Sequence, residues 1–144
     1  MRRQVRRGLL RLDAANLPLD WENLADEIEG VGKSDRRGVV SQLERIIEYL
    51  LRLEFSPSEF PRRGWKVSVS DARREADLIL ADSLSLPGRL ADLLPDVWRR
   101  GRAEAANGLK PDGLPSKMLP ADCPYTADQL LDCGWWPTNR HGLD

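Results

Sequence analysis

The sequence has few of the side chains on which most metal and nucleophile chemistry depends. Its 144 residues include one histidine, His141, and two cysteines, Cys123 and Cys133. The cysteines form no CxxC pair, and two are too few for a disulfide framework or a zinc site. A single histidine leaves imidazole triads and histidine ligation without their main component. We therefore predict no metal and no cofactor, and a reducing cytoplasmic location.

Long hydrophobic runs and an excess of one charge are also missing. The apolar residues Leu9 and Leu10 are followed at once by Arg11, and no run approaches the roughly 18 apolar residues of a membrane-spanning helix. The formal net charge is -1, with 41% hydrophobic and 31% charged residues. This balance predicts a soluble globular protein with one core, no membrane contact and no general affinity for polyanions.

Charge is unevenly distributed near the N-terminus. Residues 20–35 contain six acids and one base, Lys33, whereas residues 1–12 contain no acid and five arginines: Arg2, Arg3, Arg6, Arg7 and Arg11. A solvated basic arm beside an acidic helix explains this pattern. An arm that touches nucleic acid or an acidic partner is the alternative.

Apolar side chains recur at helical spacing, which predicts an all-α protein. A first helix over residues 20–29 has Asp20 as its N-cap and ends at glycines in residues 30–32. Ser34 can cap a second helix that runs to about Phe55. Its broad apolar stripe marks it as the central helix of the core: Val39, Val40, Leu43, Ile46, Ile47, Leu50 and Leu51.

The next segment is predicted to be extended. Residues 56–69 are rich in Ser, Pro and Arg, and residues 65–69 alternate like a brief strand. A third helix then begins at Ser68 or Ser70, and a fourth begins near Pro87.

The C-terminal third combines a kinked helix, a loop and a short helix. Pro95 lies on the solvent side of the fourth helix, where we expect a kink or a break. Residues 108–125 contain four prolines and are predicted to be an ordered loop, after which Thr126 caps a short helix over residues 127–132.

These segments predict one small bundle of four to five helices with long ordered connections. Residues 1–19 form a basic N-terminal arm or a truncated helix, residues 20–137 form the helical domain, and residues 138–144 form a flexible tail. Trp135 and Trp136 follow a helix too short to be stable alone, so we expect at least one of them to pack on the core with Leu130 and Leu131; an exposed anchor for a partner is the alternative.

Several short motifs occur in a distinctive order: residues 22–29, Gly32-Lys33-Ser34 with Arg36-Arg37, Leu50-Leu51, Trp65 with Arg73-Arg74, Ser83-Leu84-Ser85-Leu86, and Cys123-Pro124-Tyr125-Thr126 with Gln129-Leu130-Leu131. Together they resemble the bacterial family known as domain of unknown function 29, over about residues 8–137. The resemblance implies an all-helical cytosolic protein and no established activity.

Two features depart from the family pattern. Members usually begin with an aromatic helix, where this chain has only the arginine-rich residues 2–12. Their second helix commonly ends in His-Leu-Leu, where this chain has Tyr49-Leu50-Leu51. A family histidine acting as a catalytic base therefore does not carry over to this chain.

Arg36 is the charged residue with the least ordinary predicted position. On the second helix it projects with Val39 and Leu43 into the apolar stripe, where an unpaired charge is costly. If the first two helices are antiparallel, Glu27 or Glu29 can pair with it. A structural ion pair is the favoured interpretation, and anion binding is the alternative.

Trp65 lies among basic residues, in Arg62-Arg63-Gly64-Trp65-Lys66. This mixture suits stacking on a nucleic-acid base beside phosphates, but the same spacing suits a tryptophan that plugs the open end of a bundle. We favour the plug.

Three classes of function remain. The leading prediction is a non-catalytic helical interaction module that binds a partner protein or forms a homo-oligomer. The first alternative is a nucleic-acid-associated regulatory factor using the N-terminal arginines and residues 62–66. The second is an enzyme with carboxylate and arginine chemistry, which requires four side chains in one cleft: Glu27, Arg37, Tyr49 and Arg74.

Overall fold

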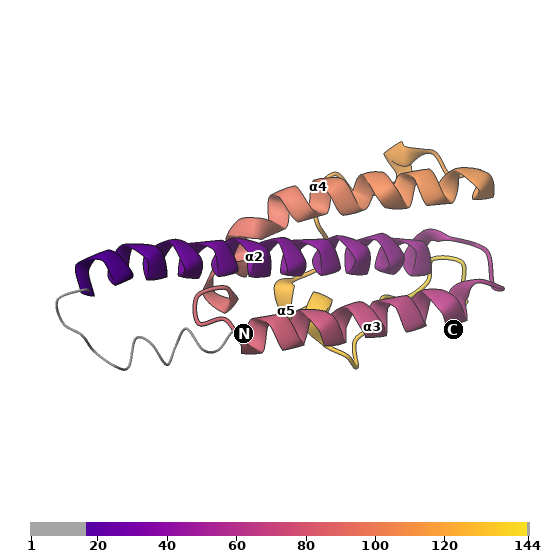
Figure 1. The fold of residues 1–144 in the computed structure, drawn as a ribbon. Coiled ribbons are helices and arrows are strands. Elements are labelled where there is room, and N and C mark those ends of the chain that lie inside the picture. The colour runs from indigo at the N-terminus through magenta and orange to yellow at the C-terminus, as the bar shows by residue number, and fades with distance from the viewer. Residues whose placement is uncertain (1–16, 144) are drawn as a thin grey trace. The chain divides into compact units, whose positions relative to one another are not determined.

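The computed structural model describes residues 17–143, with the side chains of residues 32–143. Within that part the chain forms α2 (Leu17–Phe55), α3 (Arg62–Ala81), α4 (Leu90–Leu109) and α5 (Ala127–Leu131), with the 3₁₀ helices η2 (Pro87–Arg89), η3 (Lys110–Asp112) and η4 (Ser116–Met118) (Figure 1). Residues 17–143 contain no strand, so the all-α prediction is confirmed. The chain divides into two units, Met1–Ser34 and Asp35–Asp144, and the core described below belongs to the second. The N-terminal arginines lie outside the described residues.

The predicted turn at residues 30–32 is wrong, because α2 is helical from residue 17 to residue 55. Glycine costs about 1 kcal/mol in a helix interior, but it ends a helix only where the chain turns into a left-handed conformation. Gly32 has no positive φ, unlike Gly113 and Gly142. Ser34 is therefore an interior residue of α2 and not the N-cap of a second helix.

The predicted extended strap and strand over residues 56–69 are also wrong, because α3 begins at Arg62. Pro61 precedes the first turn with φ of -81°, which suits a helix start. Val69, Ala72 and Ala76 then face the core from α3 and are completely buried. This burial overrides the short alternating pattern of residues 65–69.

The core is built around the C-terminal half of α2, which has α3 antiparallel on one side and α4 parallel on the other (Figure 1). Two flanking helices explain why the buried stripe of α2 is so wide: Val39, Leu43, Ile46, Ile47, Leu50, Leu51 and Leu53 are each at most 1% exposed. Gly101 of α4 lies against Ile47, where an added Cβ would be 2.7 Å from the Ile47 Cγ2 atom. The close approach of α4 to α2 therefore depends on this glycine.

The predicted fourth helix is confirmed, and its apolar stripe of Leu90, Val97, Trp98 and Ala105 is buried. Pro95 is exposed and α4 continues through it, so the chain does not break there. A proline on the solvent side leaves the packed face of the helix intact.

The loop between α4 and α5 is ordered, as predicted. Arg102 donates hydrogen bonds from Nε to the Pro120 carbonyl oxygen at 2.7 Å and from Nη2 to those of Ser116 and Leu119 at 2.9 and 3.1 Å. Trp98 Nε1 donates to the Ala121 carbonyl oxygen at 2.8 Å. Two side chains of α4 thus donate hydrogen bonds to backbone carbonyl oxygens of the loop.

The last short helix also forms and docks as predicted. Thr126 and Gln129 make a reciprocal capping box at the start of α5, and Leu130 is completely buried. Leu131, Trp135 and Trp136 pack against the core. The segment is stable because it closes the core, since five helical residues are too few to be stable alone.

The prediction of a flexible tail at residues 138–144 is wrong for residues 139–143. Asn139 is only 4% exposed, and its Nδ2 donates to the carbonyl oxygens of Leu53 and Ser56 at 2.8 and 3.0 Å. The Arg140 backbone N–H donates to the Glu54 carbonyl oxygen at 2.9 Å, and His141 Nε2 donates to that of Phe55 at 3.0 Å. A helix leaves its last four carbonyls without helical partners, and residues 139–141 donate to three of those in α2, which belong to Leu53, Glu54 and Phe55.

Candidate functional site

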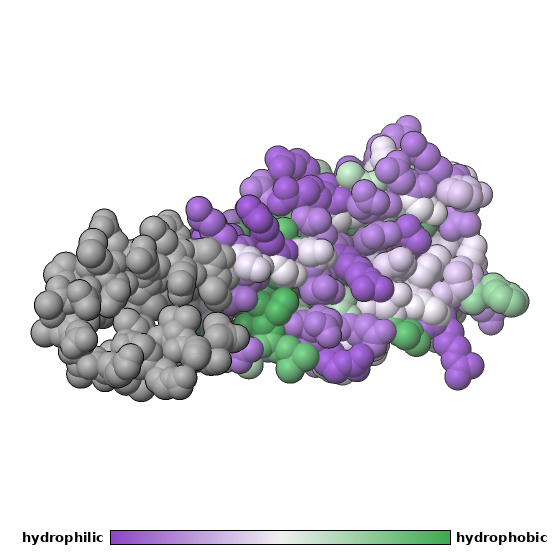
Figure 2. All heavy atoms as spheres, viewed as in Figure 1, coloured by the Kyte–Doolittle hydropathy of each residue, from purple (hydrophilic) through white to green (hydrophobic). Residues whose placement is uncertain are grey.

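The outer face of α3 exposes apolar side chains that no other part of the described structure covers. Val67 and Leu78 are 56% and 57% exposed, although the opposite side of the same helix is buried in the core. Phe60 before the helix and Leu84 after it are almost fully exposed, at 97% and 105%. Figure 2 shows hydrophobic residues reaching the surface along this edge, with hydrophilic residues between them. Exposed apolar side chains gathered along one helix indicate a contact surface.

An ion pair lies between the two apolar positions on that face. Arg74 Nη2 is 2.7 Å from Asp71 Oδ1, and the two side chains are 66% and 49% exposed. Val67, Asp71, Arg74 and Leu78 are spaced by four, three and four residues, so they share one side of the helix. We call these four residues the outer stripe of α3.

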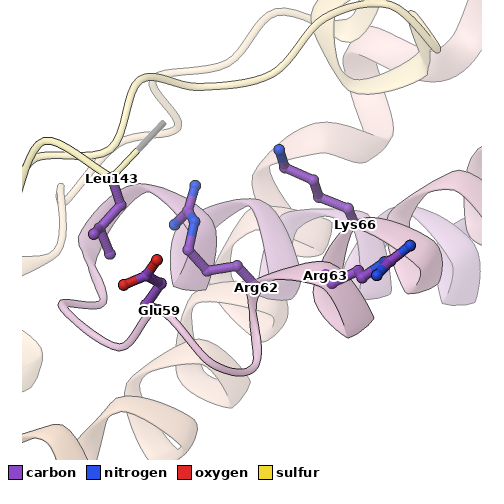
Figure 3. Close-up of a pocket in the computed structure, with 5 residues that line it drawn as sticks. All are labelled: Glu59, Arg62, Arg63, Lys66 and Leu143. Carbon is purple, nitrogen blue, oxygen red and sulfur yellow. The ribbon is translucent and has the colours of Figure 1, made fainter.

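A basic pocket lies beside the first turn of α3 (Figure 3). Its volume is about 280 Å³, and it is lined by Glu59, Arg62, Arg63, Lys66 and Leu143. Arg62 is only 6% exposed, and its Nη1 donates to the Leu53 carbonyl oxygen at 2.7 Å. Figure 3 shows Arg63 pointing away from Arg62 and Glu59. The basic side chains of this sequence motif therefore line the pocket but point in different directions.

Trp65 packs against the core, as the plug interpretation predicts, and is half-buried. The Arg52 guanidinium carbon lies 6.0 Å from the centroid of the Trp65 ring and 4.9 Å from that of Tyr49. Arg52 also pairs with Glu48 at 2.6 Å. The Trp65 ring is thus occupied by intramolecular packing and a cation–π contact, which leaves less of it for stacking on a base.

Arg36 and Arg37 are exposed and line an open groove of about 570 Å³ between α2 and α4. The other lining residues are Val40, Ser41, Glu44, Leu93, Asp96 and Arg100. Arg100 Nε pairs with Glu44 Oε2 at 2.7 Å, so the groove holds charges of both signs. The prediction that Arg36 lies buried in the apolar stripe is wrong, and the antiparallel turn that would bring Glu27 or Glu29 to it is absent. The side chains of Glu27 and Glu29 lie outside the described residues.

The carboxylate and arginine constellation is not assembled among the described side chains. Arg37 lies in the groove, Tyr49 contacts Arg52, and Arg74 pairs with Asp71 on the outer side of α3. These are three separate environments. The side chain of Glu27 lies outside the described residues.

Burial shifts the pKa values of two groups near the core, Cys123 and Glu48. Desolvation raises the pKa of the Cys123 thiol, although a backbone hydrogen bond at Tyr125 lowers it in part. A cysteine nucleophile needs a lowered pKa, so Cys123 is in the wrong environment for that role. Burial also raises the pKa of Glu48 despite the nearby Arg52. Among the described residues, no three His, Cys, Asp or Glu side chains gather as metal ligands, and no helix is long and apolar enough to cross a membrane.

Sequence reasoning missed the structural role of Arg73 and used this residue only as part of the family motif. It is completely buried, and its Nε and Nη2 donate to the carbonyl oxygens of Leu130 and Gln129 at 2.8 and 3.0 Å. Its guanidinium carbon lies 4.9 Å from the centroid of the Trp136 ring. Burial lowers the pKa of Arg73, yet the group stays charged because its ordinary value is so high. Arg73 therefore holds the C-terminal end of α5 on α3.

Glu54 and Tyr125 form a second structural link that has no local sequence signal. The Tyr125 hydroxyl donates to Glu54 Oε1 at 2.8 Å, and Arg140 Nε lies 3.0 Å from Glu54 Oε2. The contacting residues are 71 and 86 positions apart in the chain. Only the folded chain brings them together.

The described residues thus define a small all-helical domain with an exposed helix face and a structural network of buried arginines. The chain belongs to the family described as Domain of unknown function DUF29, whose family model matches residues 8–136. No curated protein and no solved structure shows a significant match to it. The family assignment confirms the sequence resemblance and carries no activity with it.

Proposed function

We propose that this protein is a non-catalytic helical interaction module that binds a protein through the outer face of α3. The observation that carries the proposal is the exposure of Val67 and Leu78 by more than half on a helix whose other side is packed in the core. The free thiols of Cys123 and Cys133 favour a reducing bacterial cytoplasm as its location.

The chemistry of the face favours a protein over a small ligand. The face is convex and lies on a regular helix, so it offers contact area and not an enclosed pocket. Apolar side chains that flank an ion pair match the composition of helix contacts between proteins, where apolar area supplies affinity and charges set orientation.

The test is capture of cellular proteins on immobilised variants. Val67→Glu combined with Leu78→Glu places charges on the face without altering a buried residue, so captured partners should be lost while the melting temperature stays unchanged. Met118→Glu is the matched control, because Met118 is 54% exposed but lies on η4. If the wild type, the double variant and Met118→Glu capture the same proteins, this face is not the binding surface.

Nucleic-acid binding is a second candidate, and the basic pocket at the start of α3 supports it. Three of its five lining residues are basic and one is acidic. Binding through phosphates would weaken steeply with salt, and Arg63→Glu would reduce it. Equal binding of short DNA and RNA oligonucleotides by wild type and Arg63→Glu, or none by either, would remove this candidate.

A further inference from the structure

The outer stripe of α3 has the same spacing when it is read from either end. Val67 and Leu78 are its outer members, and Asp71 and Arg74 are its inner members. Both pairs are centred on one point, between Ala72 and Arg73. Arg63 and Asp82, which are exposed at the two ends of the helix, are centred on the same point. An order of this kind suits contact between two identical helices that run in opposite directions.

We propose that the outer face of α3 docks on the same face of a second copy of this chain, antiparallel and about a two-fold axis between Ala72 and Arg73. This inference rests on the proposed function and names its partner. Val67 then lies opposite the partner's Leu78, about 8 Å along the helix from the axis at 1.5 Å per residue. Asp71 lies opposite the partner's Arg74, and Arg63 lies toward the partner's Asp82.

Charge decides the direction of the pairing. In the antiparallel arrangement each inner carboxylate meets an arginine, so the intrahelical pair of Asp71 and Arg74 becomes part of a four-charge cluster at the axis. In a parallel arrangement Asp71 would face the partner's Asp71, which is repulsive. The antiparallel helix dipoles favour the same choice.

Small and apolar residues complete the face. Gly64 and Ala81 are exposed at opposite ends of α3, and no heavy atom lies within 4 Å of a Cβ built on Gly64. Small side chains let two helix backbones approach closely. Phe60 precedes α3 and Leu84 follows it, and both side chains are fully or almost fully exposed.

Other occupants fit this face less well. The two bases Arg63 and Arg74 are matched by the two acids Asp71 and Asp82, and the acids Glu75 and Asp77 are also exposed on α3, so the face has no excess of positive charge for a polyanion. A charged pair at its centre is unsuited to insertion among lipid chains. A second copy supplies both the apolar and the charged complement from the same residues.

The size of the face sets the expected strength. One helix face with two flanking side chains offers less than the roughly 800 Å² per partner of a standard stable interface. We therefore expect a dimer with a Kd on the order of micromolar and not a permanent complex.

The test is sedimentation velocity of the purified full chain over about 1 to 200 µM, a range that brackets such a Kd. The wild type should shift from monomer to dimer. Arg74→Asp places two acids against two acids, and Asp71→Arg places two bases against two bases, so each variant alone should remain monomeric. An equimolar mixture of the two restores every opposite-charge contact and should form a heterodimer.

Arg99→Asp is the matched control, because Arg99 forms the same kind of exposed pair, with Asp96 three residues earlier on α4. It should dimerise like the wild type. A wild type that stays monomeric, a dimer that survives Arg74→Asp, or a mixture that fails to associate would each overturn the inference. The proposed function is tested separately by the capture experiment, which does not depend on self-association. It is supported if the variant with both Val67→Glu and Leu78→Glu loses a captured protein other than a second copy of this chain.

Discussion

Neighbouring residues in this chain have opposite environments, and Arg73 and Arg74 show it most clearly. Arg73 is completely buried and donates to the last carbonyls of α5, whereas the Arg74 side chain is 66% exposed and pairs with Asp71. One residue of helical rotation, about 100°, separates a structural arginine from a surface arginine. The charge alone therefore says nothing of the role.

The two arginines predict different costs of substitution. Arg73→Met leaves the Leu130 and Gln129 carbonyl oxygens without donors, so it should lower the free energy of unfolding by about 1 to 3 kcal/mol. Arg74→Met should change it by less than about 0.5 kcal/mol, as is usual at exposed positions. Urea unfolding of both variants at low protein concentration measures the difference. Equal effects would show that the Arg73 contacts do not hold α5.

Tyr125 predicts a specific sensitivity to alkali. Burial, and then the negative charge of Glu54, raise the pKa of Tyr125 in the folded state. In the unfolded chain the phenol ionises near its ordinary value of about 10. The folded state therefore holds the proton more tightly, and its stabilising contribution is complete below about pH 10 and is lost as the pH rises further.

Wild type should thus lose up to about 1.4 kcal/mol per pH unit above pH 10 relative to Tyr125→Phe, which has no proton to release. Urea midpoints at about pH 8 and pH 11 compare the two proteins on either side of that value. Parallel pH dependence in both would show that the buried phenol does not govern alkaline unfolding. Tyr49 is present in both proteins and cancels from the comparison.

At the scale of elements, the packing of α4 on α2 depends on a missing side chain. A Cβ added to Gly101 would lie 2.7 Å from Ile47 Cγ2 and 3.1 Å from the Glu44 carbonyl oxygen. The Ile47 side chain is completely buried, and the Glu44 carbonyl belongs to the backbone of α2. The contact can be relieved only if the two helices move apart.

Gly101→Ala should therefore destabilise the protein by about 1 to 3 kcal/mol, although alanine is the better helix former. Gly64→Ala is the matched control in α3, because its added Cβ meets open space. It should stabilise the protein by up to about 1 kcal/mol. Thermal melts of the two variants should shift in opposite directions, and a shift in the same direction would contradict the close approach.

At the scale of the whole molecule, the C-terminal residues complete a helix that ends more than 80 positions earlier. Asn139 accepts from the backbone N–H groups of His141 and Leu143 through Oδ1 while its Nδ2 donates to Leu53 and Ser56. All four hydrogen bonds depend on one buried amide. The end of the chain is therefore part of the fold.

Asn139→Ala should lower the free energy of unfolding by about 2 to 4 kcal/mol, since it removes four hydrogen bonds and leaves the Ser56 carbonyl oxygen without the Asn139 donor, while Leu53 keeps its hydrogen bond from Arg62. Thr138→Ala, at the exposed neighbouring position, should have almost no effect. A chain that ends at Pro137 should be at least as unstable as Asn139→Ala in a urea titration. If it unfolds like the full chain, residues 139–143 contribute nothing to stability.

Local patterns in the sequence determined the all-α class, the apolar faces of α2 and α4, the Thr126 capping box and the docking of the last helix. Each of these features depends on residues within a few turns of one another. The tertiary structure decided that α3 begins at Arg62 and that Arg73, Glu54 and Asn139 are structural, because their partners are contributed by distant segments. It also separated Arg37, Tyr49 and Arg74, which composition alone allowed to meet. A side chain's role here follows from what the fold places opposite it, and no local pattern encodes that.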